Sequence, residues 1–176
     1  LIHDLTRPMV PSELPGVHHL HAVDEAGVHP LLLAVGSERY VPYRKTTACE
    51  LLTQANAILG FNQCSLAKYL WISAHEDNPQ LDPHDVKAFF KHMLERVQWS
   101  HDLHFQTKTT MDTLDYSGEK LNFGSKLVIA ALGEAKRQLG QKAPNSITVP
   151  KMFSQLKVAS EGILVLQATK FENYDL

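Results

Sequence analysis

The sequence has no excess of positive charge and no long apolar segment. Its 17 lysines and arginines stand against 19 aspartates and glutamates, which gives a formal net charge of −2. Nucleic acid and anionic membranes call for a one-sided positive field, so neither is an expected partner. No apolar run reaches the roughly 18 residues that span a bilayer, and the first residues lack the basic-then-apolar layout of a signal peptide. We therefore expect a cytoplasmic protein with no membrane span.

Cysteine is also scarce. Cys49 and Cys64 are the two cysteines, too few for a disulfide framework, and both lie in apolar-rich sequence. Because cytosolic thiols are kept reduced, we expect two packed thiols rather than a disulfide.

An initiator methionine is absent as well. The chain opens on Leu1-Ile2-His3-Asp4-Leu5, and three prolines follow within the next ten residues. This start predicts a piece of a longer protein. The 176 residues are 44% hydrophobic, enough for one core, so we expect a single domain over residues 1–176.

The first third of the chain predicts a β-hairpin and a helix. Apolar runs at residues 17–23 and 30–35 are joined by a turn in which Gly27 can take the positive φ that tight turns need. Thr47 and Glu50 have the spacing of a capping box, and apolar residues follow at helical spacing up to Gly60.

The remaining pattern alternates strands with helices. Residues 68–74 (KYLWISA) are typical of a strand covered on both faces. Asp82 as N-cap, with Pro83 at the first helical position, predicts a helix through Val97. Further strands are predicted at 103–107, 126–132 and 163–168, with a short helix around Met152, Phe153 and Leu156. The fold class is therefore α/β, a single-domain layered mixed β-sheet with flanking helices.

The common catalytic and metal-binding motifs are missing. The chain has ten histidines, four of them within residues 18–29, but no His-Glu-x-x-His, no Cys-x-x-Cys and no helical pair of histidines four residues apart. The Gly-x-Ser-x-Gly elbow, the dinucleotide fingerprint and the phosphate-loop pattern are also absent. We expect the histidines to lie on polar hairpin faces and at packing contacts rather than in a metal site.

Two segments could still carry a site. His75-Glu76-Asp77 follows a buried strand, where open α/β sheets tend to bind ligands; the alternative is a polar loop that leads to the next helix. Residues 109–126 combine hydroxyls, carboxylates, glycines, a tyrosine and a lysine between two strands. Such a loop could face a ligand or a neighbouring domain, or be ordered for structural reasons alone.

This second loop resembles a known family. Asp112-Thr113-Leu114-Asp115-Tyr116-Ser117-Gly118, with Gly124-Ser125-Lys126, is similar to the late segment of UbiD-like carboxy-lyases, the group named for 3-octaprenyl-4-hydroxybenzoate carboxy-lyase of ubiquinone synthesis. The segment at residues 1–5, Pro15-Gly16-Val17, His75-Glu76-Asp77 and the helix from Asp82 to Val97 follow the family's order. The likeness covers nearly all of the chain but only the last third or so of the family's usual length. His75 stands where related chains tend to have a third acidic residue, which leaves the substrate open.

The resemblance implies a C-terminal domain of a reversible decarboxylase acting on aromatic or α,β-unsaturated carboxylic acids. In the family, prenylated FMN, a divalent metal (Mn or Mg) and a monovalent cation do the chemistry, and their ligands lie upstream in flavin-binding and split-barrel domains. The C-terminal domain closes over the substrate side and contributes to homo-oligomer contacts. We therefore expect no catalytic, cofactor-binding or metal-binding residue in this stretch, and an inactive chain in isolation.

The resemblance also gives a set of residues that could face the active site: Leu114, Asp115, Tyr116, Ser125 and Lys126. A decarboxylation needs an electron sink for the developing carbanion, and no side chain in this sequence provides one. Two alternatives stay open. One is a small-ligand or metal-dependent enzyme that uses His75, Glu76 and Asp77, and the other is a scaffold protein without a decarboxylase parent.

Overall fold

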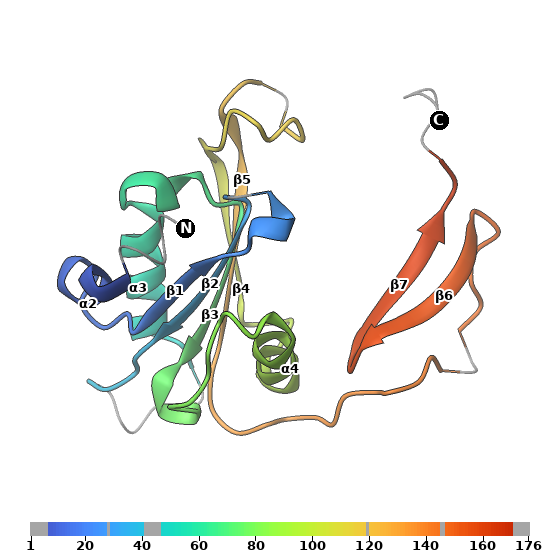
Figure 1. Ribbon diagram of the computed structural model, residues 1–176, viewed down its shortest axis with the longest axis horizontal. Helices are drawn as coiled ribbons and strands as arrows, with labels where there is room; N and C mark the ends of the chain where they lie inside the picture. Colours follow the sequence, from blue (N-terminus) through green and yellow to red (C-terminus); the bar gives the residue numbers. More distant parts are fainter. Residues whose placement is uncertain (1–6, 28, 41–46, 119, 145–146, 171–176) are drawn as a thin grey trace. The chain divides into compact units, whose positions relative to one another are not determined.

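The computed structural model describes residues 7–27, 29–40, 47–118, 120–144 and 147–170. The chain divides into two compact units, residues 1–136 and residues 137–176 (Figure 1). Whether the two form one domain, as expected for residues 1–176, stays a prediction.

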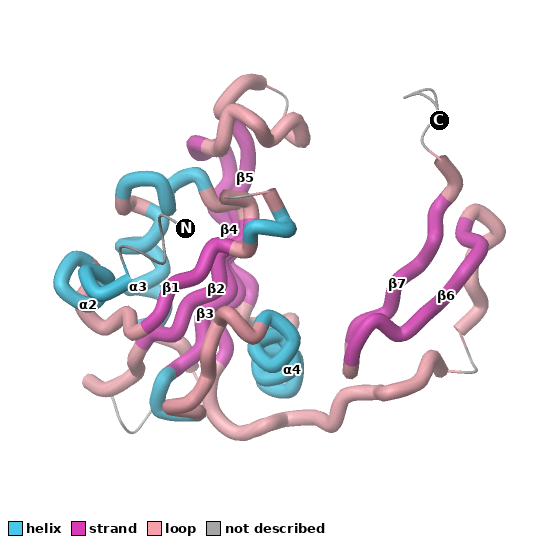
Figure 2. The backbone as a smooth tube through the Cα atoms, in the orientation of Figure 1, coloured by secondary structure: helices cyan, strands magenta, loops and turns pink. Residues whose placement is uncertain are grey.

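The first unit is built on a five-stranded mixed sheet (Figure 2). The strands lie in the order β1-β2-β3-β5-β4. Strands β2, β3 and β5 are parallel to one another, and the outer strands β1 and β4 each run antiparallel to their neighbour. The bounds are β1 His19–Ala22, β2 Leu31–Gly36, β3 Tyr69–Ala74, β4 Leu103–Thr110 and β5 Phe123–Ala131.

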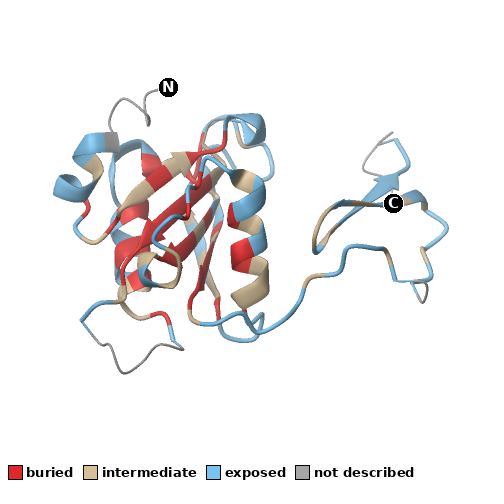
Figure 3. Ribbon diagram, turned by 60° about the horizontal axis from the view of Figure 1, so that its bottom comes forward, coloured by how far each residue is buried: buried red, intermediate tan, exposed pale blue. Residues whose placement is uncertain are grey.

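A helix covers each face of this sheet (Figure 3). On one face α3 (Glu50–Leu59) buries Leu51, Ala55 and Ile58 against the strands. On the other, α4 (Val86–Arg96) packs Phe89 and Met93 into a second apolar cluster. The shorter helical segments are η1 Arg7–Met9, α2 Val10–Glu13, η2 Asp24–Ala26, η3 Asn62–Leu66 and η4 His75–Asp77.

These features confirm the predicted α/β class with a mixed sheet and flanking helices. The predicted hairpin is the antiparallel pair β1–β2, and Gly27 has a φ of 96° in its connection. The strands expected at 68–74, 103–107, 126–132 and 163–168 all form within a few residues of their predicted bounds. Cys49 and Cys64 are both reduced thiols.

Both predicted helix caps are wrong. Helix α3 begins after Cys49, which makes no side-chain cap; instead the Glu38 carboxylate, distant in sequence, accepts hydrogen bonds from the amides of Cys49 (2.6 Å) and Leu51 (2.9 Å). Helix α4 begins three residues later than expected. Its cap is Asp85, which accepts from the Ala88 amide at 2.9 Å.

The second unit contains a two-stranded antiparallel ribbon, β6 (Phe153–Ser160) and β7 (Ile163–Ala168). The short helix predicted around Met152, Phe153 and Leu156 is wrong, because this segment pairs with β7 as a strand. Gly162, at a φ of 75°, closes the two-residue turn between the strands. A short apolar run fits both the helical and the strand periodicity, and here the pairing with β7 decides for the strand.

The carboxylate cap of α3 gives a stability prediction. Replacing Glu38 by alanine is expected to lower the free energy of unfolding by about 1–2 kcal/mol, because two helix-start amides lose their acceptor. Glu38→Gln keeps an acceptor oxygen and should lose less. Urea unfolding measures both, with Glu25→Ala, at an exposed position, as the control. Equal stability of Glu38→Ala and the control would contradict this role.

Candidate functional site

The two candidate segments lie at opposite edges of the sheet (Figure 1). The β4–β5 connection, residues 111–122, lies where the parallel strands β2, β3 and β5 begin. The segment His75-Glu76-Asp77 follows the carboxyl end of β3. The two predicted sites therefore cannot contribute to one centre within the first unit.

Asp115 organises the tip of the β4–β5 connection. Its carboxylate accepts hydrogen bonds from the Ser117 amide (2.9 Å) and the Ser117 hydroxyl (2.5 Å), and pairs with the Lys68 ammonium at 3.2 Å. Lys68 also donates to the Ser117 hydroxyl. Burial by itself would raise the pKa of Asp115, but the bonds from Ser117 and Lys68 outweigh it and lower the pKa. Asp115 is thus a carboxylate that holds the loop.

Asp112 ties the same loop to the β1–β2 hairpin. It accepts from the Leu114 amide at 2.9 Å and lies 2.5 Å from the Nδ1 atom of His29. The Leu114 amide and the His29 ring together lower the pKa of Asp112. With Asp112 and Asp115 both bonded within the protein, Leu114 and Tyr116 lie on a fastened loop with 73% and 85% of their surface exposed.

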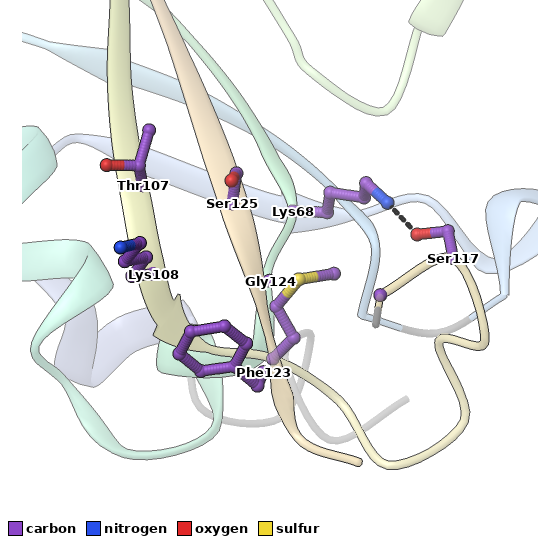
Figure 4. Close-up of a pocket in the computed structure, with 9 residues that line it drawn as sticks. Lys68, Thr107, Lys108, Ser117, Phe123, Gly124 and Ser125 are labelled. Carbon is purple, nitrogen blue, oxygen red and sulfur yellow. Dashed lines mark hydrogen bonds between the residues drawn. The ribbon is translucent and has the colours of Figure 1, made fainter. Parts of the chain in front are cut away.

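A hollow of about 380 Å³ lies beside this loop. Figure 4 shows Lys68 bonded to Ser117 on one side, and Thr107 and Lys108 of β4 on the other. Ser125 and Gly124 of β5 lie between them. The residues that line the hollow are Lys68, Thr107, Lys108, Met111, Ser117, Gly118, Phe123, Gly124 and Ser125. It therefore combines cations, hydroxyls and an apolar wall.

The five residues expected to face an active site do not gather in one place. Ser125 lines the hollow, but its neighbour Lys126 projects from the opposite face of β5, since successive strand residues alternate. Lys126 is 3% exposed, and its ammonium donates to the carbonyls of Ala67 (2.7 Å) and Ser65. Burial lowers the pKa of Lys126. These contacts hold the start of β3, and a role of the five residues toward a substrate stays a prediction.

At the opposite edge, the His75 segment is bonded to three neighbouring elements. The His75 ring stacks on His18 with centroids 4.1 Å apart, and His18 Nε2 lies 2.7 Å from the Ser37 hydroxyl. Glu76 accepts from the Glu38 amide at 3.0 Å. Asp77 accepts from the Gly133 amide at 2.7 Å. Each of the three side chains thus contacts a different neighbouring segment at this end of the strands.

Burial and hydrogen bonds shift the pKa values of both carboxylates at this edge in opposite directions. Burial raises the pKa of Asp77, against the lowering effect of its bond from Gly133. Burial would also raise the pKa of Glu76, but bonds from the Glu38 amide, its own amide and Ser37 outweigh it and lower the pKa. Within the described ranges, no group of three or more His, Cys, Asp or Glu residues could hold a metal ion. The alternative of an enzyme centred on His75, Glu76 and Asp77 gains no geometric support.

Sequence reasoning missed Lys68, Thr107, Lys108 and Phe123 at the hollow. Lys68 comes just before a buried strand, and Lys126 lies near the start of another. Had β3 and β5 been recognised as parallel neighbours, Lys68 would have been expected beside the β4–β5 connection. Lys108 had no such signal, because a β-bulge brings it to the hollow.

Comparison with known families identifies this domain. A family model described as the 3-octaprenyl-4-hydroxybenzoate carboxy-lyase C-terminal domain matches residues 1–131. The match ends within the first compact unit, five residues before its boundary at Lys136. The chain belongs to this family, the C-terminal domain of UbiD-like carboxy-lyases. The resemblance drawn from residues 112–118 and 124–126 is thereby confirmed.

Among curated proteins, a Chlamydia pneumoniae protein named as a subunit of 4-hydroxybenzoate decarboxylase is 39% identical over 164 residues, which cover 92% of this chain and 26% of that protein. A Chlamydia trachomatis protein with no named activity is 34% identical over 177 residues, covering 99% of this chain and 28% of that protein. The chain thus spans little more than a quarter of the length of these relatives.

Solved structures share the fold. The vanillic acid decarboxylase of Sedimentibacter hydroxybenzoicus in closed form matches with a TM-score of 0.57 at 15% identity, covering 82% of this chain and 28% of that one. A UbiD-class enzyme from Pelotomaculum thermopropionicum, in complex with FMN, matches with a TM-score of 0.54 at 18% identity, covering 84% of this chain and 30% of that one. None of the helices in the described part of the chain is long and apolar enough to cross a membrane.

Proposed function

We propose that this chain is the C-terminal lid and assembly domain of a carboxy-lyase that reversibly decarboxylates aromatic or α,β-unsaturated carboxylic acids. The observation that carries the proposal is the family match over residues 1–131, nearly all of the first compact unit. The relative from Chlamydia pneumoniae, named as part of a decarboxylase, supports the reaction class. The partners would be the flavin-binding and split-barrel domains of its own chain and further copies of the protein.

The described residues do not fit the cofactors that this reaction uses in the family. Asp112, Asp115, Glu76 and Asp77 each accept hydrogen bonds from the protein, and no set of them converges as metal ligands would. The hollow of about 380 Å³ lies at the small end of the range for ligand pockets. We therefore assign prenylated FMN, with its Mn or Mg ion and monovalent cation, to the rest of the protein. Prenylated FMN would supply the electron sink.

The β4–β5 connection has the properties that a lid needs. Two carboxylates, Asp112 and Asp115, accept hydrogen bonds from backbone amides of residues 114 and 117, which favours one conformation of this part of the loop before any substrate binds. Between and beside them, Leu114 and Tyr116 expose apolar surface. Covering a substrate with such side chains removes water from the reacting carboxylate. In this proposal Leu114 and Tyr116 cover the substrate, and Asp115 positions the loop that carries them.

The test compares the whole protein with the 176-residue chain. The whole protein, loaded with prenylated FMN, should release CO2 from 4-hydroxybenzoate or a related acid, whereas the isolated chain should neither turn over these acids nor acquire a flavin absorbance. Replacing Leu114 and Tyr116 together by serine in the whole protein should lower kcat/KM at least about tenfold. Met9→Ser, at another exposed apolar residue, is the matched control. Turnover or tight flavin binding by the isolated chain would refute the proposal.

A further inference from the structure

The hollow beside the β4–β5 connection carries a positive charge that the described residues do not neutralise. Its two cations differ: the Lys68 ammonium is paired with Asp115 at 3.2 Å, whereas the Lys108 ammonium has no hydrogen bond or ion pair within the described part of the chain. Lys108 is exposed and lines the hollow. One cation is therefore available to a ligand.

The backbone at Lys108 is unusual. Its φ is 58°, in the left-handed region that L residues other than glycine rarely adopt. The residue lies in a bulge of β4, where the pairing with β5 shifts between Gln106 and Thr109. The bulge places both Thr107 and Lys108 along the hollow, opposite Ser125. Such local outliers often re-aim side chains toward a functional site.

Hydroxyl donors accompany this cation. Thr107 and Ser125 are exposed and line the hollow, and neither hydroxyl makes a hydrogen bond within the described residues. The Ser117 hydroxyl differs, because its proton is donated to Asp115. The lining thus offers an ammonium and two hydroxyls as donors.

The rest of the lining is small or apolar. A Cβ atom on Gly124 would lie 1.9 Å from the Met111 sulfur, and one on Gly118 would lie 2.2 Å from the Phe123 carbonyl oxygen. A side chain at either position would clash with these atoms, so glycine allows the wall of the hollow to pack closely there. Among the described residues that line the hollow none is a carboxylate, and the neighbouring Asp115 carboxylate is paired with Lys68.

We propose that this hollow binds a small oxyanion, with Lys108 as its cation and Thr107 and Ser125 as hydroxyl donors. The oxyanion would be either the carboxylate of a small organic acid or a phosphate. A charge-assisted hydrogen bond to an ammonium is about twice as strong as a neutral one, so Lys108 carries most of the affinity. The inference goes beyond the proposed function, since it assigns a binding site to this chain's own side chains.

The test is an NMR titration of the 15N-labelled 176-residue chain at low ionic strength. The probes are inorganic phosphate, benzoate and the uncharged benzamide. We expect saturable shifts of the Lys108, Gly118 and Gly124 amides with at least one of the two anions and none with benzamide. Lys108→Met should raise the Kd at least about tenfold, and Lys108→Arg should change it less than about threefold. Lys87→Met, at an exposed position on α4, is the matched control.

The results with phosphate and benzoate distinguish the two kinds of oxyanion. Saturation by benzoate alone assigns an organic carboxylate, saturation by phosphate alone assigns a phosphate group, and saturation by both supports a site for either oxyanion. The proposal is overturned if neither anion saturates these shifts by about 50 mM, or if Lys108→Met binds as the unsubstituted chain does. Thermal melts of each variant show that the fold is retained. Turnover by the whole protein plays no part, so this test can fail while the proposed function holds.

Discussion

Replacing Lys126 by alanine is expected to lower the free energy of unfolding by about 2–4 kcal/mol. The side chain is 3% exposed, and its ammonium donates to the carbonyls of Ser65 and Ala67, just before β3. Alanine leaves two carbonyl acceptors without their donor, and the net loss of each hydrogen bond costs about 0.5–1.5 kcal/mol. It also removes the methylene packing of the lysine stem. Urea unfolding monitored by circular dichroism measures the loss.

Lys126→Met separates the two contributions. Methionine keeps most of the apolar stem but removes the donor, so its loss should be smaller, about 1–3 kcal/mol. Lys87→Ala, on the exposed face of α4, should change stability by less than about 0.5 kcal/mol. A loss below about 1 kcal/mol for Lys126→Ala would show that the buried ammonium is not holding the start of β3.

Lys126 also shows where sequence reasoning stops. Gly124-Ser125-Lys126 helped to reveal the family, and the resemblance placed Ser125 and Lys126 together among the residues that could face the active site. In the structure β5 begins at Phe123, so both are strand residues, and the alternation of side chains sends them to opposite faces. A motif can identify a family while its residues serve different purposes. β5 begins three residues before the predicted strand at 126–132, and placing its start there would have separated the two side chains.

The elements that the sequence predicted well depend on local patterns. The hairpin around Gly27, the buried strand β3 and the apolar faces of α3 and α4 all follow from periodicity and turn chemistry over a few residues. The wrong predictions depend on contacts between residues that are separated in the sequence. Helix α3 is capped by Glu38, eleven residues before Cys49, and only the folded chain brings the two together. The start of β6 matches a helical spacing, but pairing with β7 decides its conformation.

The stability of this domain is expected to fall between pH 6.5 and pH 4 through one buried histidine. His92 of α4 is 6% exposed, and burial, with a smaller contribution from Arg96, lowers its pKa to about 4. In the unfolded chain the pKa returns to about 6.5, so the unfolded state binds the proton more readily in this window. The contribution is therefore fully present above pH 6.5 and is lost as the pH falls toward 4. Its size is about 3 kcal/mol, from 1.36 kcal/mol per pKa unit.

His92→Leu should remove this part of the pH dependence. Nε2 of His92 is buried and has no hydrogen-bond partner among the residues that the structure describes, so leucine gives up no bond made by that atom. Stability at pH 7 should be unchanged or higher, and the difference from the unsubstituted protein should widen by about 3 kcal/mol on going to pH 4. His101→Gln, at an exposed position, is the control and should keep the original slope. Parallel stability curves for His92→Leu and the unsubstituted protein would mean that the imidazole reaches water or an acceptor in solution. The α4 face would then be less tightly closed over the sheet than its packing around Phe89 and Met93 implies.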